Sequence, residues 1–206
     1  CQFDTAYHEH YSYLSLTAVQ RIFAANGLVL IDVQELPTHG GSLRVSAARA
    51  DATAHPQASP EGATRVARLL ETEVAAGMLN ESFYSDFQRQ PARIKRELLS
   101  FLLQCQAQGL KVGAYGAAAK GNTLLNFAGV RPDLLPYVVD KNPAKQGQYL
   151  PGSRIPVVDE ANLKAHRPDR VLILPWNLRD EVAAQLDYVC GWGGRFVVAV
   201  PRLEVY

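Results

Sequence analysis

Side chains able to transfer protons are densest near the start of the chain, in the stretch YHEHYSY that begins at Tyr7. Histidine titrates near neutral pH, and a neighbouring carboxylate or phenol can orient its ring. His10, with Glu9 or Tyr7, therefore has the chemistry of a general base. In a strand, His8 and His10 would share one face. In a helical turn, the side chains of Tyr7, His10 and Tyr11 would converge instead.

Two other interpretations of this stretch stay open. His8 and His10 have a spacing that metal ligands use, but no third and fourth ligand stand at suitable spacing, so we expect no metal site. A polar, aromatic turn at the edge of a sheet would require no chemistry of these residues at all. The pattern alone does not choose between a base and such a turn.

A second candidate site is the glycine turn in the segment KVGAYGAAAKGNTLLN. Gly116, Ala118 and Gly121 form G-x-A-x-x-G, a dinucleotide-binding pattern with alanine in place of the middle glycine. Such a turn directs backbone N–H groups and a helix N-terminus at one point, which suits an anion. The alanine Cβ would hold a pyrophosphate slightly away, so a purely structural turn is the alternative. Asn122 or Thr123 is expected to cap the following helix.

Other candidate ligand contacts stand near the ends of the expected strands. Asp140 follows Gly121 by 19 residues, close to the offset at which an acidic residue meets a ribose, although local turn bonding is an equal alternative. Lys120 could pair with a phosphate or simply be solvated. Trp176 could stack on a base or a sugar ring, or belong to the core. The weaker candidates for the same cleft are Asn177, His39 and Ser42.

The order of the expected elements indicates an α/β fold. From residue 111, a strand, the glycine turn and a helix are followed by strands at 137–140, 170–174 and 195–200, with a helix from 178 to about 189 before the last strand. This alternation predicts a Rossmann-like parallel sheet covered by helices. Open sheets of this kind bind ligands at the carboxyl ends of their strands, where the candidates from the turn and the strand ends would gather.

The first fifty residues follow a different pattern. Ser15 is a suitable N-cap for a helix, and strands at 28–36 and 42–48 form a hairpin. A helix and an antiparallel hairpin are a natural end to a mixed sheet. The stretch DATAHPQASP is short and polar with two prolines, as linkers are. The expected organisation is the end of one domain in residues 1–50, a linker in 51–60, and a helical lead-in with the Rossmann-like domain in 61–206.

Composition excludes several classes of partner. The chain has 206 residues, of which 48% are hydrophobic, and this is enough for a sizeable core. A net charge of +1 gives no basic surface for nucleic acid or an anionic membrane. No apolar run approaches the roughly 20 residues of a membrane span. The three cysteines are far apart and form no C-x-x-C pair, so we expect a reduced, cytoplasmic setting.

Five motifs in order resemble the C-terminal part of the S-adenosylmethionine-dependent sugar C-methyltransferases: FDTAYHEHYSYLSL, ELPTHGGSLRV, GAYGAAAKGNTLLN, YVVDKNPAKQGQYLPGSRIPV and LILPWNLRDEV. The resemblance covers nearly the whole chain. It implies an enzyme with an N-terminal zinc-binding segment, a central methyltransferase domain and a C-terminal Rossmann-like domain. The zinc segment and most of the S-adenosylmethionine site would then lie outside this sequence. Residues 1–50 would end the methyltransferase domain, whose remainder would be a partner, and the chain alone would be inactive.

The resemblance also implies a reaction, the methylation of a carbon beside a ketone in a nucleotide-linked deoxysugar. On the matching motif His10 would be the base, while Tyr7 and Glu9 would orient it or contact the enolate and sugar. The Rossmann-like half would hold the nucleotide-diphosphate sugar and not NAD. Two alternatives remain open, a non-catalytic nucleotide-binding module and an NAD-dependent oxidoreductase.

Overall fold

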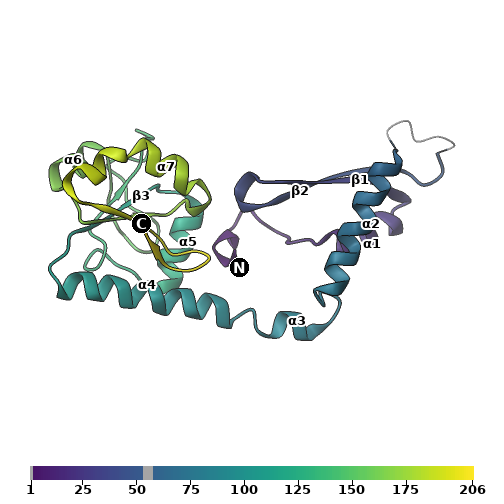
Figure 1. The fold of residues 1–206 in the computed structure, drawn as a ribbon, viewed down its shortest axis with the longest axis horizontal. Coiled ribbons are helices and arrows are strands. Elements are labelled where there is room, and N and C mark those ends of the chain that lie inside the picture. The colour runs from purple at the N-terminus through teal and green to yellow at the C-terminus, as the bar shows by residue number, and fades with distance from the viewer. Residues whose placement is uncertain (1, 53–57) are drawn as a thin grey trace. The chain divides into compact units, whose positions relative to one another are not determined.

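The chain divides into two units, each described here by itself (Figure 1). A computed structural model describes residues 2–52 and 58–206. The hairpin unit contains Tyr11–Phe87, and the sheet unit contains the residues up to His10 together with Gln88–Tyr206. Residues 53–57 of the linker expected at 51–60 lie outside the described residues. The observed division falls at two other places in the chain, so residues 61–87 belong with the hairpin and not with the sheet.

The hairpin unit is built on two antiparallel strands joined by a short turn. Leu16, Val33 and Val66 form its buried core, to which α1, β1 and α2 each contribute one residue. An ion pair of 2.8 Å between Arg65 and Asp32 also joins α2 to β1. The strands and the Ser15 cap expected from the sequence are confirmed, since the Ser15 hydroxyl accepts the Ala18 N–H. The elements are α1 (Leu16–Ala25), β1 (Leu28–Leu36), β2 (Ser42–Arg49), α2 (Pro60–Ala75) and α3 (Glu81–Ser85).

A carboxylate from α2 satisfies the start of α1. Glu73 Oε1 accepts the Leu16 N–H at 2.7 Å, and Oε2 accepts the backbone and hydroxyl groups of Thr17 at 2.8 and 2.6 Å. The first N–H groups of a helix have no partner within the helix, and its N-terminus favours negative charge. Burial alone would raise the pKa of Glu73, but the hydrogen bonds outweigh it, and the pKa lies below its ordinary value of 4.5.

The sheet unit contains six strands in the order β5-β4-β3-β6-β7-β8. All neighbouring pairs are parallel except the last, β7 with β8. The chain runs outward from β3 through β4 to β5, then returns to the other side of β3 as β6. The strands are β3 (Val112–Tyr115), β4 (Val138–Val139), β5 (Val157–Val158), β6 (Arg170–Ile173), β7 (Arg195–Val198) and β8 (Glu204–Val205).

Both faces of this sheet are buried by helices (Figure 1). Successive strand residues point to opposite faces. Ala114, Leu172 and Val197 pack against α4 and α5, whereas their neighbours Ile173 and Phe196 pack against α6 and α7. The result is the three-layer α/β fold that the alternating pattern predicts. The helices are α4 (Arg89–Ala107), α5 (Ala119–Ala128), α6 (Ala161–His166) and α7 (Arg179–Gln185).

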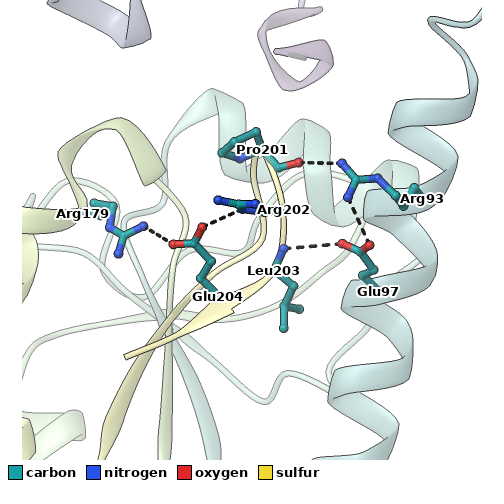
Figure 2. A network of polar contacts seen from close by, with 7 residues as sticks. All are labelled: Arg93, Glu97, Arg179, Pro201, Arg202, Leu203 and Glu204. Carbon is teal, nitrogen blue, oxygen red and sulfur yellow. Dashed lines mark hydrogen bonds and ion pairs between the residues drawn. The ribbon is translucent and has the colours of Figure 1, made fainter.

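The short edge strand β8 and the residues just before it are held by two separate sets of polar contacts (Figure 2). Glu204 accepts hydrogen bonds from Arg179 at 2.7 Å and Arg202 at 3.0 Å. On the other side, the Arg93 guanidinium donates to the Pro201 carbonyl at 3.3 Å and lies 3.4 Å from Glu97. The hydrogen bond to Glu204 raises the pKa of Arg179. These contacts attach the end of the chain to α4 and to α7.

Glu73→Gln tests the carboxylate at the start of α1. We expect the variant to lower the free energy of unfolding by about 2–4 kcal/mol at pH 7, because charge-assisted hydrogen bonds are lost. Since the Glu73 pKa is depressed by folding, its contribution is present above pH 4.5 and is lost as the pH falls through the folded-state value. Urea denaturation followed by circular dichroism over a pH series measures both effects.

The matched control is Glu71→Gln, an exposed carboxylate on the same helix, which should stay within about 0.5 kcal/mol of the parent. Equal stabilities of the Glu73 and Glu71 variants at pH 7 would contradict the assignment.

Candidate functional site

The reversal of strand order places two chain segments side by side at the carboxyl edge of the sheet. Gly116 follows β3, and Pro175 follows β6, the strand paired with β3. A ligand crevice forms at this position in open parallel sheets because the connections leave in opposite directions. The segment after β6 contains Trp176 and Asn177, so the structure brings these two predicted residues to the turn.

Gly116 and Gly121 are required by packing between the turn, α5 and the segment after β6. A Cβ on Gly116, which has φ +93°, would lie 2.5 Å from Pro175 Cδ. A Cβ on Gly121 would lie 2.6 Å from Leu174 Cβ. The two glycines therefore let the turn and α5 approach the segment after β6. This packing gives the turn the structural role that the sequence pattern allowed as an alternative to phosphate binding.

Helix α5 starts at Ala119, earlier than the sequence predicts. Its N-cap is Ala118, which makes no side-chain cap. The expected capping role of Asn122 or Thr123 is therefore wrong, because both lie within the first turns of the helix. Asn122 instead receives hydrogen bonds from the Asn126 side chain, at its carbonyl and at its amide oxygen.

Asp140 binds the glycine turn itself. Its Oδ2 accepts the Ala117 N–H at 2.8 Å, and its Oδ1 accepts the Asn142 N–H at 2.8 Å. Lys145 lies 3.3 Å from Asp140 Oδ2 and donates to the Ala117 carbonyl at 2.8 Å. Both carboxylate oxygens are thus occupied by backbone donors. This geometry matches the local turn bonding that was the alternative to a ribose contact.

The N-terminal segment is attached to the same edge by a buried acid. Asp4, in the short helical turn Phe3–Thr5, is 0% exposed, and its Oδ2 accepts the Trp176 indole N–H at 2.6 Å. The Phe3 ring packs 5.0 Å from the Phe127 ring of α5. Burial raises the pKa of Asp4 above its ordinary value of 3.8, while the indole N–H and Lys120 oppose this change.

Lys120 completes this cluster. It is 9% exposed, its Nζ lies 4.9 Å from the centre of the Trp176 ring, and it is 3.4 Å from Asn177 Oδ1. Burial lowers the pKa of Lys120, and the negative charge of Asp4 opposes that change. Asp4, Lys120 and Trp176 therefore form a buried ionic and aromatic cluster between α5 and the segment after β6. We call it the edge cluster.

His10 lies in a turn five residues after Thr5, in the same unit as the edge cluster. Its Nδ1 is 2.9 Å from the Thr5 carbonyl oxygen, and its ring is 4.2 Å from the Tyr7 ring. A carbonyl only accepts, so Nδ1 carries the proton in the neutral ring and Nε2 keeps a lone pair. Of the two backbone alternatives, the helical turn that brings Tyr7 to His10 is the one observed. Tyr11 begins the other unit.

Glu9 does not orient His10 in this structure. Its carboxylate lies 4.0 Å from His8, and the two side chains are 70% and 87% exposed. An exposed pair at this distance contributes little to stability. In this structure the Thr5 carbonyl orients the His10 ring instead of Glu9, and no sequence pattern indicates this acceptor.

His39 and Ser42 belong to the hairpin unit. His39 lies in the turn between the two strands with φ 57°, and the Ser42 hydroxyl donates to the Thr38 carbonyl at 3.0 Å. Ser42 also lines an open groove of about 840 Å³ beside the hairpin. Their place in the same cleft as the Gly116 turn stays a prediction.

Among the described residues, no group of three or more His, Cys, Asp or Glu side chains could hold a metal ion. Nor does that part of the chain include a helix of the length and apolar character needed to cross a membrane.

Comparison with known proteins identifies the family. The family model for the C-methyltransferase C-terminal domain matches residues 37–201. The chain belongs to this family. The C-methyltransferase NovU of Streptomyces niveus is 35% identical over 204 residues, which is 99% of this chain and 47% of NovU. The chain therefore spans about half the length of this curated relative. The C-methyltransferase family model covers the glycine turn and the sheet edge, and it begins after the Tyr7–His10 turn.

Gly121→Ala tests whether close packing decides the glycine turn in this C-methyltransferase domain. Helix propensity alone would favour alanine by about 1 kcal/mol. We expect a loss of about 1–3 kcal/mol instead, because the new Cβ would overlap the rigid Leu174 Cβ. Thermal unfolding followed by circular dichroism gives the difference.

Gly191→Ala is the control, since a Cβ there meets nothing within 4 Å. A stabilised Gly121→Ala variant would show that the turn tolerates a side chain and that packing is not its reason.

Proposed function

We propose that this chain is the part of an S-adenosylmethionine-dependent C-methyltransferase that supplies the general base and the site for a nucleotide-linked keto-deoxysugar. The supporting observation is that the His10 turn and the Gly116 turn belong to one unit, whose sheet edge holds both Asp4 and the segment after β6. The C-methyltransferase family and the relative NovU support the type of reaction. By itself the chain would be inactive, and residues 11–50 would complete a methyltransferase domain.

His10 has the arrangement that a base needs. Its Nδ1–H donates to the Thr5 carbonyl, so in the neutral ring the lone pair that would take a proton is on Nε2. The adjacent Tyr7 ring restricts the imidazole on one side. Once protonated, the ring would keep its hydrogen bond to Thr5, so no rearrangement accompanies proton transfer.

The proposed reaction balances with this one base. His10 Nε2 takes the proton from the carbon beside the ketone, and the electrons of that C–H bond form an enolate. The enolate carbon then bonds to the methyl group, and the electrons of the old bond stay with the sulfur that carried it. The imidazolium afterwards returns its proton to solvent. Tyr7 and Glu9 would contact the enolate and the sugar.

S-adenosylmethionine, when bound, supplies an electrophilic methyl group. We assign none of the described residues to it. Its site and the zinc-binding segment would lie outside this sequence.

The sugar nucleotide would bind at the carboxyl edge, with its diphosphate near the start of α5. The N–H groups of Ala117 and Ala118 are bound to Asp140 and to the Gly116 carbonyl. These donors are thus engaged within the protein, so side chains would have to hold the diphosphate of any ligand. The Ala118 Cβ adds bulk where a dinucleotide would lie close. This favours a sugar nucleotide over NAD. Asn122 and Asn177 are the contacts we propose, with Lys120 and Trp176 supporting them.

His10→Ala tests the base in the complete polypeptide that contains this sequence. We expect the rate of methyl transfer to fall by about 100-fold or more, the usual contribution of a positioned base. Affinity for the sugar nucleotide should change little. Transfer of labelled methyl groups measures the rate, with His166→Ala as the control at the other end of the sheet unit. A parent-like rate would refute the base assignment and favour a non-catalytic nucleotide-binding module.

Ligand choice is tested by calorimetry with a deoxythymidine diphosphate sugar and with NAD. We expect heat of binding for the sugar nucleotide and none for NAD, because Ala118 replaces the glycine against which the pyrophosphate of a dinucleotide would lie. Asn177→Ala should weaken binding by about 10-fold if its amide meets the ligand. Binding of NAD alone would support the oxidoreductase instead.

A further inference from the structure

We propose that Asp4 is a positioning residue, which holds the His10 turn at the sheet edge through its contacts with Trp176 and Lys120. The proposal rests on the proposed role of His10 as the base. Asp4 itself is not expected to touch the substrate, because its side chain is fully buried. It would act only by placing the backbone that orients His10.

Burying the Asp4 carboxylate costs free energy. A buried carboxylate is unfavourable unless hydrogen bonds and an opposite charge compensate it. Asp4 has one hydrogen bond of 2.6 Å from Trp176, the attraction of Lys120, and an Oδ1 without a hydrogen-bond partner among the described residues. Burial correspondingly raises its pKa. An apolar side chain would avoid this cost, so the acid indicates a specific attachment and not simple packing.

Asp4 is next in the chain to the residue whose carbonyl orients the His10 imidazole. Thr5 is the next residue, and its carbonyl accepts the His10 Nδ1–H at 2.9 Å. Displacing Asp4 moves the Thr5 peptide, and the acceptor that sets the orientation of His10 moves with it. Phe3 also attaches this segment, because its buried ring belongs to the same core as α4 and α5 and lies 5.0 Å from the Phe127 ring. Asp4 adds the polar attachment, through its hydrogen bond from Trp176.

The two partners of Asp4 belong to different parts of the sheet unit. Lys120 belongs to α5, after β3, and Trp176 follows β6, so the two lie on opposite sides of the strand-order reversal. Hydrogen bonding between Asp4 and Trp176 connects residues 172 apart in the sequence. The acid therefore ties the His10 turn to both sides of the crevice that we assign to the sugar nucleotide.

The test uses Asp4→Asn and Trp176→Phe in the complete polypeptide, with Asp180→Asn and Trp192→Phe as matched controls. Asp180 has a side chain that is 96% exposed, and Trp192 donates its N–H to the Pro168 carbonyl elsewhere in the unit. Asp4→Asn keeps the shape and removes the charge. Trp176→Phe keeps a ring beside Lys120 and removes the N–H. Amide hydrogen exchange of residues 2–10 reports the attachment.

We expect amide hydrogen exchange in residues 2–10 to rise by about 10-fold or more in both variants, because each loses a charge-assisted hydrogen bond. The kcat should fall about 10-fold, while KM for the sugar nucleotide stays within about threefold, as a misplaced base would produce. The indole N–H resonance of Trp176 should shift in Asp4→Asn, while that of Trp192, the other tryptophan of this sequence, stays. An unshifted Trp192 resonance also shows that the variant is folded.

Three results would overturn the proposal. Unchanged exchange in Asp4→Asn would show that the acid does not hold the segment. Increased exchange with an unchanged kcat would show that the attachment does not position the base. Equal losses of kcat in the control variants would show a general effect. A parent-like rate in His10→Ala would instead refute the proposed function, and the exchange data would still report the attachment separately.

Discussion

Burial of the sheet on both faces is the constraint from which the rest of the sheet unit follows. Because α4 and α5 cover one face and α6 and α7 the other, only the ends of the strands remain for a ligand. The reversal of strand order between β3 and β6 then opens one position at the carboxyl edge, where no connecting segment crosses. Gly116 and Gly121 lack side chains at this position because Pro175 and Leu174 leave no space for them.

A segment from the start of the chain occupies this edge, and it changes how the neighbouring residues are interpreted. Lys120 and Trp176, viewed alone, have the chemistry of a phosphate contact and a stacking platform. In the structure, the Trp176 N–H is bound by Asp4, and the Lys120 ammonium faces the Trp176 ring. Their polar groups support the His10 turn, so a ligand must be recognised chiefly by other donors.

The sequence predicts most of the sheet unit because alternating strands and helices produce strong patterns. It predicts the two-residue strand β4 but not β5 or β8, because strands this short give no dependable periodicity. Ala119 begins α5 without a capping side chain, so the usual signal for a helix start pointed to Asn122 instead. Asp4 was missed for a different reason. One acid beside an aromatic residue is common, and only the fold shows that its partners come from distant parts of the chain.

The choice of acceptor for His10 bears on how such a base would operate. A carboxylate at Nδ1 would orient the ring and also attract the proton that the base must later release. The Thr5 carbonyl orients the ring without a net charge. Because Thr5 is fixed through Asp4 to the edge that would hold the substrate, base and substrate would share one unit. The orientation between them would then be set by folding, before binding, which is the condition under which proximity contributes most to rate.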